Sequence, residues 1–147
     1  MFVLLSMAMA GDLRHTLSQR DGVSCSELGE ATPELREGLL ALTGVEEQPP
    51  SLPMAATSCL IERFPADPVV MSTLQGWMGQ RERVGQALMV VSLLGKVDPA
   101  WRVPLALAAM SQEDPAWRER MRVRLKRVEG LEGLEALLAE PVVTAPK

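Results

Sequence analysis

Apolar residues along most of this chain recur three or four positions apart, which is the spacing of one face of an α-helix. Few segments alternate apolar and polar residues as half-buried strands do. The helix over 81–94 is apolar nearly all round after its first turn, so we place it at the centre of the fold. Residues 11–31 look irregular. The pattern predicts an all-α protein with helices over 33–43, 53–64, 68–78, 81–94, 99–110, 115–128 and 131–139.

The dipeptide Asp-Pro marks the starts of three of these helices, at Asp67-Pro68, Asp98-Pro99 and Asp114-Pro115. An Asp side chain caps the free N–H groups of the first turn, and Pro fits the first helical position because no N–H is needed there. Thr32-Pro33 gives the first helix a start of the same kind. Recurring starts predict stacked helices, and they indicate no chemistry.

Two of the predicted helices leave alternatives open. Pro104 lies inside the helix over 99–110, so that helix either begins near Val103 or is kinked at this point. The stretch from Met121 to Leu125 alternates apolar and basic residues, as an edge strand would. The Asp-Pro start and the longer helical period favour a helix there.

A period of 31 residues relates the predicted helices. It carries Ala56 to Ala87 and Asp67 to Asp98, and it keeps the class of residue more often than the identity. Helix boundaries fall in the same register, so each repeating unit is a pair of antiparallel helices. Because stacked pairs bury a continuous core, we predict a short αα-solenoid.

Three motifs resemble the short HEAT-like repeats of the phycobilisome-lyase type. Those repeats run as an Asp-Pro-x-Val-Arg helix, a Leu-Gly-Asp-Pro turn and a Val-Pro-x-Leu helix. The matching segments are Asp114-Pro115-Ala116-Trp117-Arg118, Leu94-Gly95-Lys96-Val97-Asp98-Pro99 and Val103-Pro104-Leu105. Trp117 stands where Val is usual, and the turn carries two inserted residues. The resemblance covers residues 53–139, and it would explain Pro104 as part of a helix start.

The resemblance implies a right-handed αα-solenoid of about three antiparallel helix pairs, with the helix over 33–43 as an N-terminal capping helix. Such domains mostly bind or scaffold other proteins, and a few relatives attach bilins to phycobiliproteins. No nucleophile or bilin-binding motif carries over to this chain residue by residue. We therefore expect a non-catalytic scaffold or adaptor for a protein partner, without a cofactor. The alternatives are an accessory or lyase-like enzyme domain and a structural fragment of a longer exported protein.

The N-terminal residues bear on the compartment. Residues 1–10 are apolar and uncharged, and Ala8 and Ala10 fit the small-x-small pattern of a signal-peptide cleavage site, without a basic segment before them. This stretch is about half as long as a membrane span. We expect an export-signal remnant and a periplasmic or secreted protein; the alternative is an ordinary helix of a cytoplasmic protein. The remaining divisions are an irregular segment with a capping helix and a Pro-rich linker over 11–52, repeats over 53–139 and a tail over 140–147.

The two cysteines, Cys25 and Cys59, lie 34 positions apart, without the spacing of a zinc site. In an exported protein they would form one disulfide, which is worth about 3–4 kcal/mol through the entropy of the unfolded chain. In a cytoplasmic protein they would be buried thiols. Neither has a visible base beside it, as a nucleophile would need.

The net charge of −4 is unevenly distributed. Residues 1–80 hold 4 basic and 10 acidic residues, residues 81–128 hold 10 and 5, and residues 129–147 hold 1 and 4. A predicted interaction surface on the helix over 115–128 consists of Arg118, Arg120, Arg122, Arg124, Lys126 and Arg127. It would suit an acidic protein, an anionic lipid or a phosphate backbone; the alternative is the solvated face of a terminal repeat. The acidic net charge and the lack of interleaved aromatic residues argue against nucleic acid.

The remaining polar and aromatic candidates have ordinary explanations. His15, the only histidine, has no second group for a metal site or a nucleophile, so we expect it in solvent. Trp101 and Trp117 each follow their Asp by three positions, and they either pack between helices or anchor a partner. A solvated helix face, rather than a pair of catalytic acids, is expected for Glu129, Glu132, Glu135 and Glu140. We expect no catalytic residue and no metal site.

Overall fold

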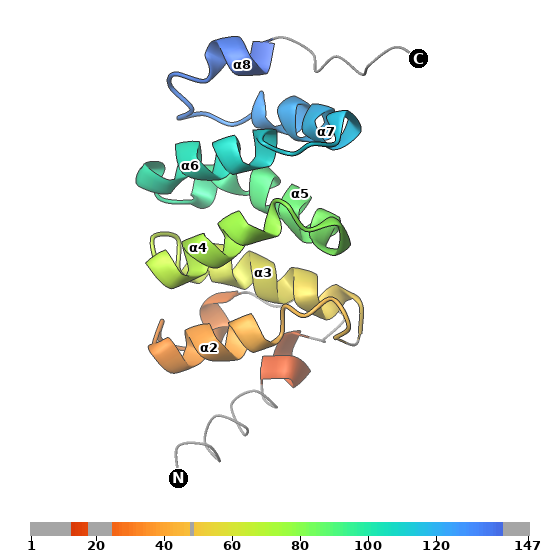
Figure 1. Cartoon of the computed structure of the whole chain (residues 1–147). Helices are drawn as coiled ribbons and strands as arrows, with labels where there is room; N and C mark the ends of the chain where they lie inside the picture. Colours follow the sequence, from red (N-terminus) through yellow and green to blue (C-terminus); the bar gives the residue numbers. More distant parts are fainter. Residues whose placement is uncertain (1–12, 18–24, 48, 140–147) are drawn as a thin grey trace. The chain divides into compact units, whose positions relative to one another are not determined.

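The computed structural model of this chain describes residues 13–17, 25–47 and 49–139, and Figure 1 shows their course. Helices and turns make up all the described ranges, and no strand occurs in them. The prediction of an all-α protein is confirmed. The expected signal remnant over 1–10 and the tail over 140–147 lie outside the described residues.

The chain divides into two compact units, residues 1–65 and residues 66–147. The division falls inside the range 53–139 that the sequence predicts for the repeats. We describe each unit by itself.

Unit 1 is built on the helices α2 (Pro33–Ala41) and α3 (Ser51–Arg63), which pack against each other. The Thr32 hydroxyl accepts a hydrogen bond from the Leu35 N–H at 3.2 Å, so α2 begins at the predicted cap. The short helix η1 (Cys25–Leu28) packs against α3. The core of this unit is aliphatic and includes Leu13, Leu17, Leu35, Leu39, Leu42, Leu52, Ala56, Leu60 and Ile61.

The stretch over 11–31 contains more helix than the sequence predicts. Residues 13–17 are helical, and η1 adds a second turn. The isolated pattern is too short to reveal either, but Leu13 and Leu17 are one helical turn apart and both are buried. A Cβ on Gly38 of α2 would lie 2.6 Å from the Leu13 side chain, so the two helical segments approach closely.

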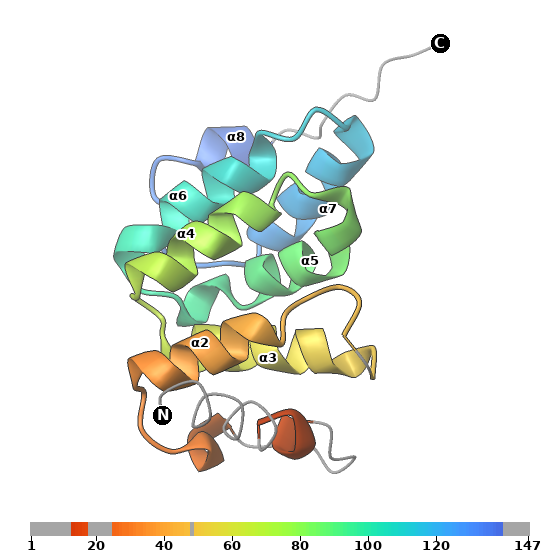
Figure 2. The same cartoon turned by 60° about the horizontal axis from the view of Figure 1, so that its bottom comes forward.

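Unit 2 contains two layers of helices (Figures 1 and 2). Helix α4 packs against α6 in one layer, α5 packs against α7 in the other, and α5 also contacts α4 and α6. The short α8 packs against α7. The elements are α4 (Pro68–Trp77), η2 (Arg81–Arg83), α5 (Val84–Ser92), η3 (Leu94–Lys96), α6 (Pro99–Met110), α7 (Pro115–Leu125) and α8 (Glu135–Ala139).

The Asp-Pro dipeptides begin α4, α6 and α7, as predicted. The Asp67 carboxylate accepts hydrogen bonds from Val69 and Val70 N–H at 2.8 and 3.3 Å. Asp98 and Asp114 accept one each, from the N–H two residues on, at 3.0 and 2.9 Å. Each cap is followed by Pro in the first helical turn. These starts are therefore fixed by neighbouring residues alone.

The 31-residue register agrees with the helix starts and with their packing. Helices α4 and α6 begin at Pro68 and Pro99, 31 residues apart, and α5 and α7 begin at Val84 and Val84's counterpart Pro115, also 31 apart. The helices related by the period are those that pack side by side within each layer. Helix α5, expected at the centre, contacts the other three long helices of unit 2.

Two expectations for the middle of unit 2 are wrong. Helix α6 does not begin near Val103: it runs unbroken from Pro99 to Met110 with Pro104 inside, because the Asp98 cap has already started it. The segment Val103-Pro104-Leu105 is therefore not a helix start, contrary to the resemblance. The predicted helix over 81–94 is shorter, with 3₁₀ turns η2 and η3 on either side of α5.

The last predicted helix, over 131–139, also begins later than expected. Gly130 and Gly133 have left-handed backbones, with φ of 83° and 91°, which a continuous helix does not allow. Helix α8 therefore starts at Glu135, although Leu131, Leu134 and Leu138 are buried as predicted. The competing edge strand over Met121 to Leu125 is absent from this described segment, which is helical throughout.

Candidate functional site

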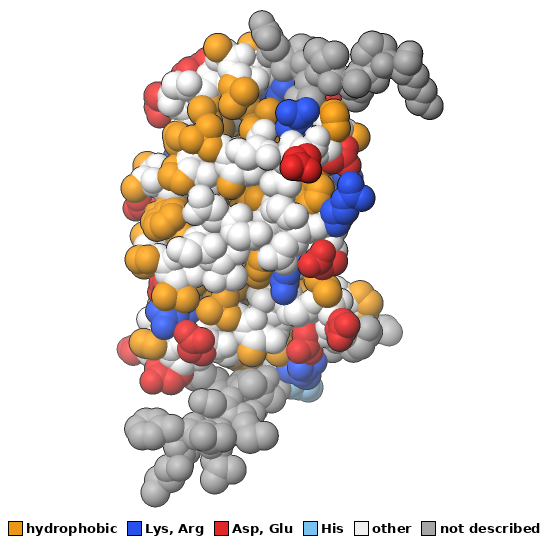
Figure 3. Space-filling model, in the orientation of Figure 1, with side chains coloured by type: hydrophobic (Ala, Val, Ile, Leu, Met, Phe, Trp, Pro, Cys, Tyr) orange, Lys and Arg blue, Asp and Glu red, His pale blue; other side chains and the backbone are white. Residues whose placement is uncertain are grey.

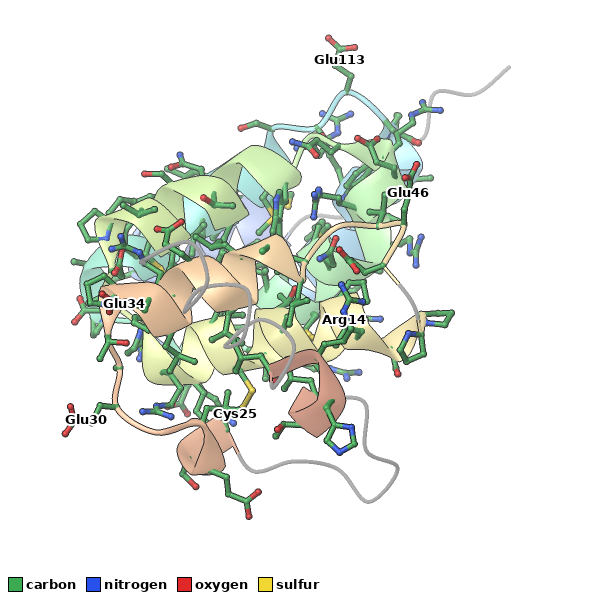
Figure 4. The ribbon with its side chains drawn as sticks, turned by 90° about the horizontal axis from the view of Figure 1, so that it is seen from below. Arg14, Cys25, Glu30, Glu34, Glu46 and Glu113 are labelled. Atoms are coloured by element: carbon green, nitrogen blue, oxygen red, sulfur yellow. A yellow bond between two sulfur atoms is a disulfide. The ribbon has the colours of Figure 1, made fainter. Side chains whose placement is uncertain are left out.

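Cys25 and Cys59 form a disulfide that joins η1 to α3, and Figure 4 shows this bond beside the Cys25 label. Both residues are buried. The Arg63 guanidinium holds the same corner, because it donates to the carbonyl oxygen of Cys25 at 2.6 Å and to that of Gly29. Of the two alternatives for these cysteines the structure has the disulfide. They act as a clamp within unit 1.

The basic residues of α7 divide into two groups on opposite sides of its buried stripe, Trp117, Met121 and Leu125. One side carries Arg120, Arg124 and Arg127, which follow each other at helical spacing and are all exposed. Arg118, Arg122 and Lys126 follow each other in the same way on the other side, where exposure increases only toward the end of the helix. The six predicted surface residues therefore do not form one surface.

Arg122 is not a surface residue: it is only 7% exposed. Its guanidinium donates to the Glu119 carboxylate at 2.5 and 2.8 Å and to the Leu138 carbonyl oxygen at 2.9 Å. The hydrogen bond with Glu119 raises the pKa of Arg122 above its ordinary value, against the opposing effect of burial. Arg122 thus fastens α8 to α7, and it belongs to the fold instead of to an interface.

The exposed side of α7 borders two hollows that share Arg120. The larger, of about 360 Å³, is lined by Glu119, Arg120, Val123, Arg124 and Arg127. The smaller, of about 220 Å³, is lined by Arg81, Val84, Asp114, Ala116, Trp117 and Arg120. We call these two together the arginine hollows. On the face shown in Figure 3, by contrast, the coloured Lys and Arg side chains are scattered among apolar, acidic and uncharged ones.

The sequence pattern does not reveal Arg81 or Val123 as members of this site. Arg81 comes from η2, far from α7 in sequence, and only the packing of α5 on α7 brings the two segments together. Val123 reads as part of the apolar stripe, yet it is 43% exposed. Its position three residues from Arg120 and four from Arg127 is the signal that could have placed it on their side of the helix.

The tryptophans are mostly internal. Trp77 is buried with the Arg83 guanidinium 4.7 Å from its ring centroid, and Arg83 also donates to Gln80 and Gln86. Trp117 is 7% exposed, and its indole N–H has no acceptor among the described residues. Trp101 is half-buried. Packing between helices therefore describes Trp117 better than an exposed anchor does.

Other polar candidates lie apart from one another. His15 is exposed on the helical segment 13–17, and Glu129, Glu132 and Glu135 are exposed near α8. Glu140 lies outside the described residues. Within the described ranges, no group of His, Cys, Asp and Glu side chains is arranged to hold a metal ion. A third hollow of about 370 Å³ lies between α7 and α8, with Leu125, Leu131 and Leu138 in its lining.

Comparison of the chain with protein families, with curated proteins and with solved structures finds no match. Among the helices that the structure describes, none has the length and apolar character needed to cross a bilayer.

Proposed function

We propose that this chain is a non-catalytic scaffold of HEAT-like helical repeats that binds a protein partner. The observation that carries this proposal is the agreement between sequence period and packing in unit 2. Helices that start 31 residues apart, α4 with α6 and α5 with α7, are the ones that pack against each other. Repeats stacked in this way cover each other's apolar sides and leave extended surfaces free for another protein.

The polar side chains singled out by the sequence support a structural role for most of the chemistry. The cysteines are joined to each other, Asp67, Asp98 and Asp114 cap helices, and Arg122 links two helices. The side chains left exposed are chiefly the arginines beside the hollows. Charged groups around concave ground favour recognition of a charged partner.

Affinity capture tests this role. The full chain, used as bait in an extract of the organism that encodes it, should retain one protein in stoichiometric amounts, and the complex should re-form from the purified components. A bait unfolded by heat serves as the control for adhesive binding. Failure to retain any stoichiometric protein would overturn the scaffold role. A copurified chromophore with visible absorbance would favour the lyase-like alternative instead.

The repeat architecture has its own test. In a right-handed αα-solenoid, successive helices of unit 2 run antiparallel and each pair is rotated slightly against the last. An experimentally determined structure should have α4 to α7 in that arrangement. Helices α4 to α7 in any other order of pairing would overturn the repeat assignment.

We also propose that the protein works in an oxidising compartment, as a periplasmic or secreted protein. The disulfide between Cys25 and Cys59 supports this, because such bonds persist outside the reducing cytosol. Mass spectrometry of protein taken from its host, alkylated before any reductant is added, should find no free thiol. Two alkylated cysteines in that material would overturn the compartment assignment.

A further inference from the structure

We infer, resting on the protein-binding role proposed above, that the arginine hollows receive an acidic segment of the partner protein. Its carboxylates would pair with Arg81, Arg120 and Arg127, and an apolar side chain between them would cover Val123. The chemistry required of the partner is therefore two or more Glu or Asp residues flanking a Leu, Ile or Val.

The charges around the hollows are not balanced within the described part of the chain. The side chains of Arg81, Arg120 and Arg127 have no hydrogen-bond or ion-pair partner there, and Arg124 donates only to the neutral Ser92 hydroxyl, at 3.1 Å. The two acids in the lining are already engaged. Glu119 is held by Arg122, and the Asp114 carboxylate caps α7. A carboxylate from outside thus meets cations without an internal competitor.

Val123 gives the site an apolar centre. It is 43% exposed, and Arg120 and Arg127 lie one helical turn before and after it on the same side of α7. An apolar contact enclosed by charged side chains is the usual anatomy of a protein interface, in which the rim stays polar. The apolar contact would supply burial, and the arginines would select acidic partners.

The same lining distinguishes a protein segment from the other polyanions. Single-stranded nucleic acids need aromatic faces for base stacking, and the aromatic residue in the lining, Trp117, is 7% exposed. An anionic membrane is flat and attracts broad basic surfaces or amphipathic helices. Here the cations border concave hollows of about 360 and 220 Å³, which suit individual side chains.

A pair of charge-reversed variants tests the site. R120E/R127E changes the hollows, and K96E/K126E makes the same change in net charge at two exposed lysines outside them. The probe is a dye-labelled, end-blocked peptide in which glutamates flank a central leucine, and the measurement is fluorescence anisotropy at low salt. Wild type and K96E/K126E should bind it alike, and R120E/R127E should bind it about tenfold more weakly or worse. Added salt should weaken the wild-type complex.

Three results would overturn the inference. They are equal binding of the peptide by both double variants, binding as tight when glutamine replaces glutamate in the peptide, and tighter binding of single-stranded DNA or phosphatidylglycerol vesicles than of the peptide. Circular dichroism and urea unfolding should give both variants the wild-type fold, so that weak binding reports the site.

The captured partner separates this inference from the scaffold role. If R120E/R127E retains the partner as well as wild type does, the scaffold role stands and the acidic-segment site is wrong. If only K96E/K126E retains it, both are supported. If wild type retains no partner, the scaffold role fails, whatever the peptide does.

Discussion

Arg122 sits in a run in which every second residue is basic, yet its guanidinium points into unit 2 and bonds Glu119 and Leu138. On a helix, alternate residues point to different sides, so such a run has no common face. Arg122 lies beside the buried stripe and Arg124 lies across it, toward solvent. Charge alone therefore predicts the presence of a basic surface, but it does not predict which of its members are accessible.

We expect R122A to destabilise the protein clearly and R124A to leave its stability within about 0.5 kcal/mol of wild type. Removing Arg122 leaves the Glu119 carboxylate and the Leu138 carbonyl oxygen without their donor, whereas Arg124 donates only to an exposed serine hydroxyl. Urea midpoints at constant m-value measure the difference. Equal midpoints for the two variants would mean that Arg122 does not fasten α8.

Gly130 and Gly133 offer a matched comparison, because both have φ near 90° but differ in their surroundings. A Cβ on Gly133 would meet no atom within 4 Å, and one on Gly130 would lie 2.7 Å from the Arg102 guanidinium. Arg102 donates to the carbonyl oxygens of Gly95 and Val97, both at 2.8 Å, so its displacement would disturb η3.

We therefore expect G133A to cost about 1 kcal/mol from backbone strain and G130A to cost more. Chemical denaturation of the two variants measures both costs. The Arg102 contact would be unimportant if G130A were no worse than G133A.

Helix starts and helix ends differ in how well the sequence predicts them. The starts of α4, α6 and α7 depend on an Asp and the Pro after it, so local pattern suffices. Pro104 is tolerated within α6, and α8 is delayed by the two glycines before it, which are outcomes of packing and backbone conformation. The same limit applies to the candidate site: its α7 arginines are visible in the sequence, whereas Arg81 joins them only through the tertiary fold.

The cap of α7 can be tested against a neighbouring acid. Asp114 accepts the Ala116 N–H at 2.9 Å, while Glu113 is exposed and points away from the ribbon in Figure 4. We expect D114A to destabilise unit 2 by about 1 kcal/mol and E113A to change stability by less than about 0.5 kcal/mol. D114N should restore most of the loss, because Asn caps as well as Asp. Urea unfolding followed by tryptophan fluorescence measures all three, and similar losses in D114A and E113A would exclude capping as the cause.

At the scale of the whole molecule, the covalent constraint and the fluorescent reporters lie in different units. Cys25 and Cys59 both belong to residues 1–65, and the three tryptophans, Trp77, Trp101 and Trp117, all belong to residues 66–147. Far-UV circular dichroism follows helices of both units, and tryptophan fluorescence follows unit 2. One denaturation experiment can therefore ask whether each unit is stabilised by its own core.

Reducing the disulfide should remove about 3–4 kcal/mol of stability, because the unfolded chain is then released from a loop between residues 34 positions apart. We expect the loss to appear in unit 1: reductant should move part of the circular dichroism transition to lower urea and leave the fluorescence midpoint unchanged. C25S/C59S should behave like the reduced protein and should not respond to reductant. If fluorescence and circular dichroism shift together, the two units unfold as one, and the clamp at Cys25 then stabilises the α7 surface together with its own unit.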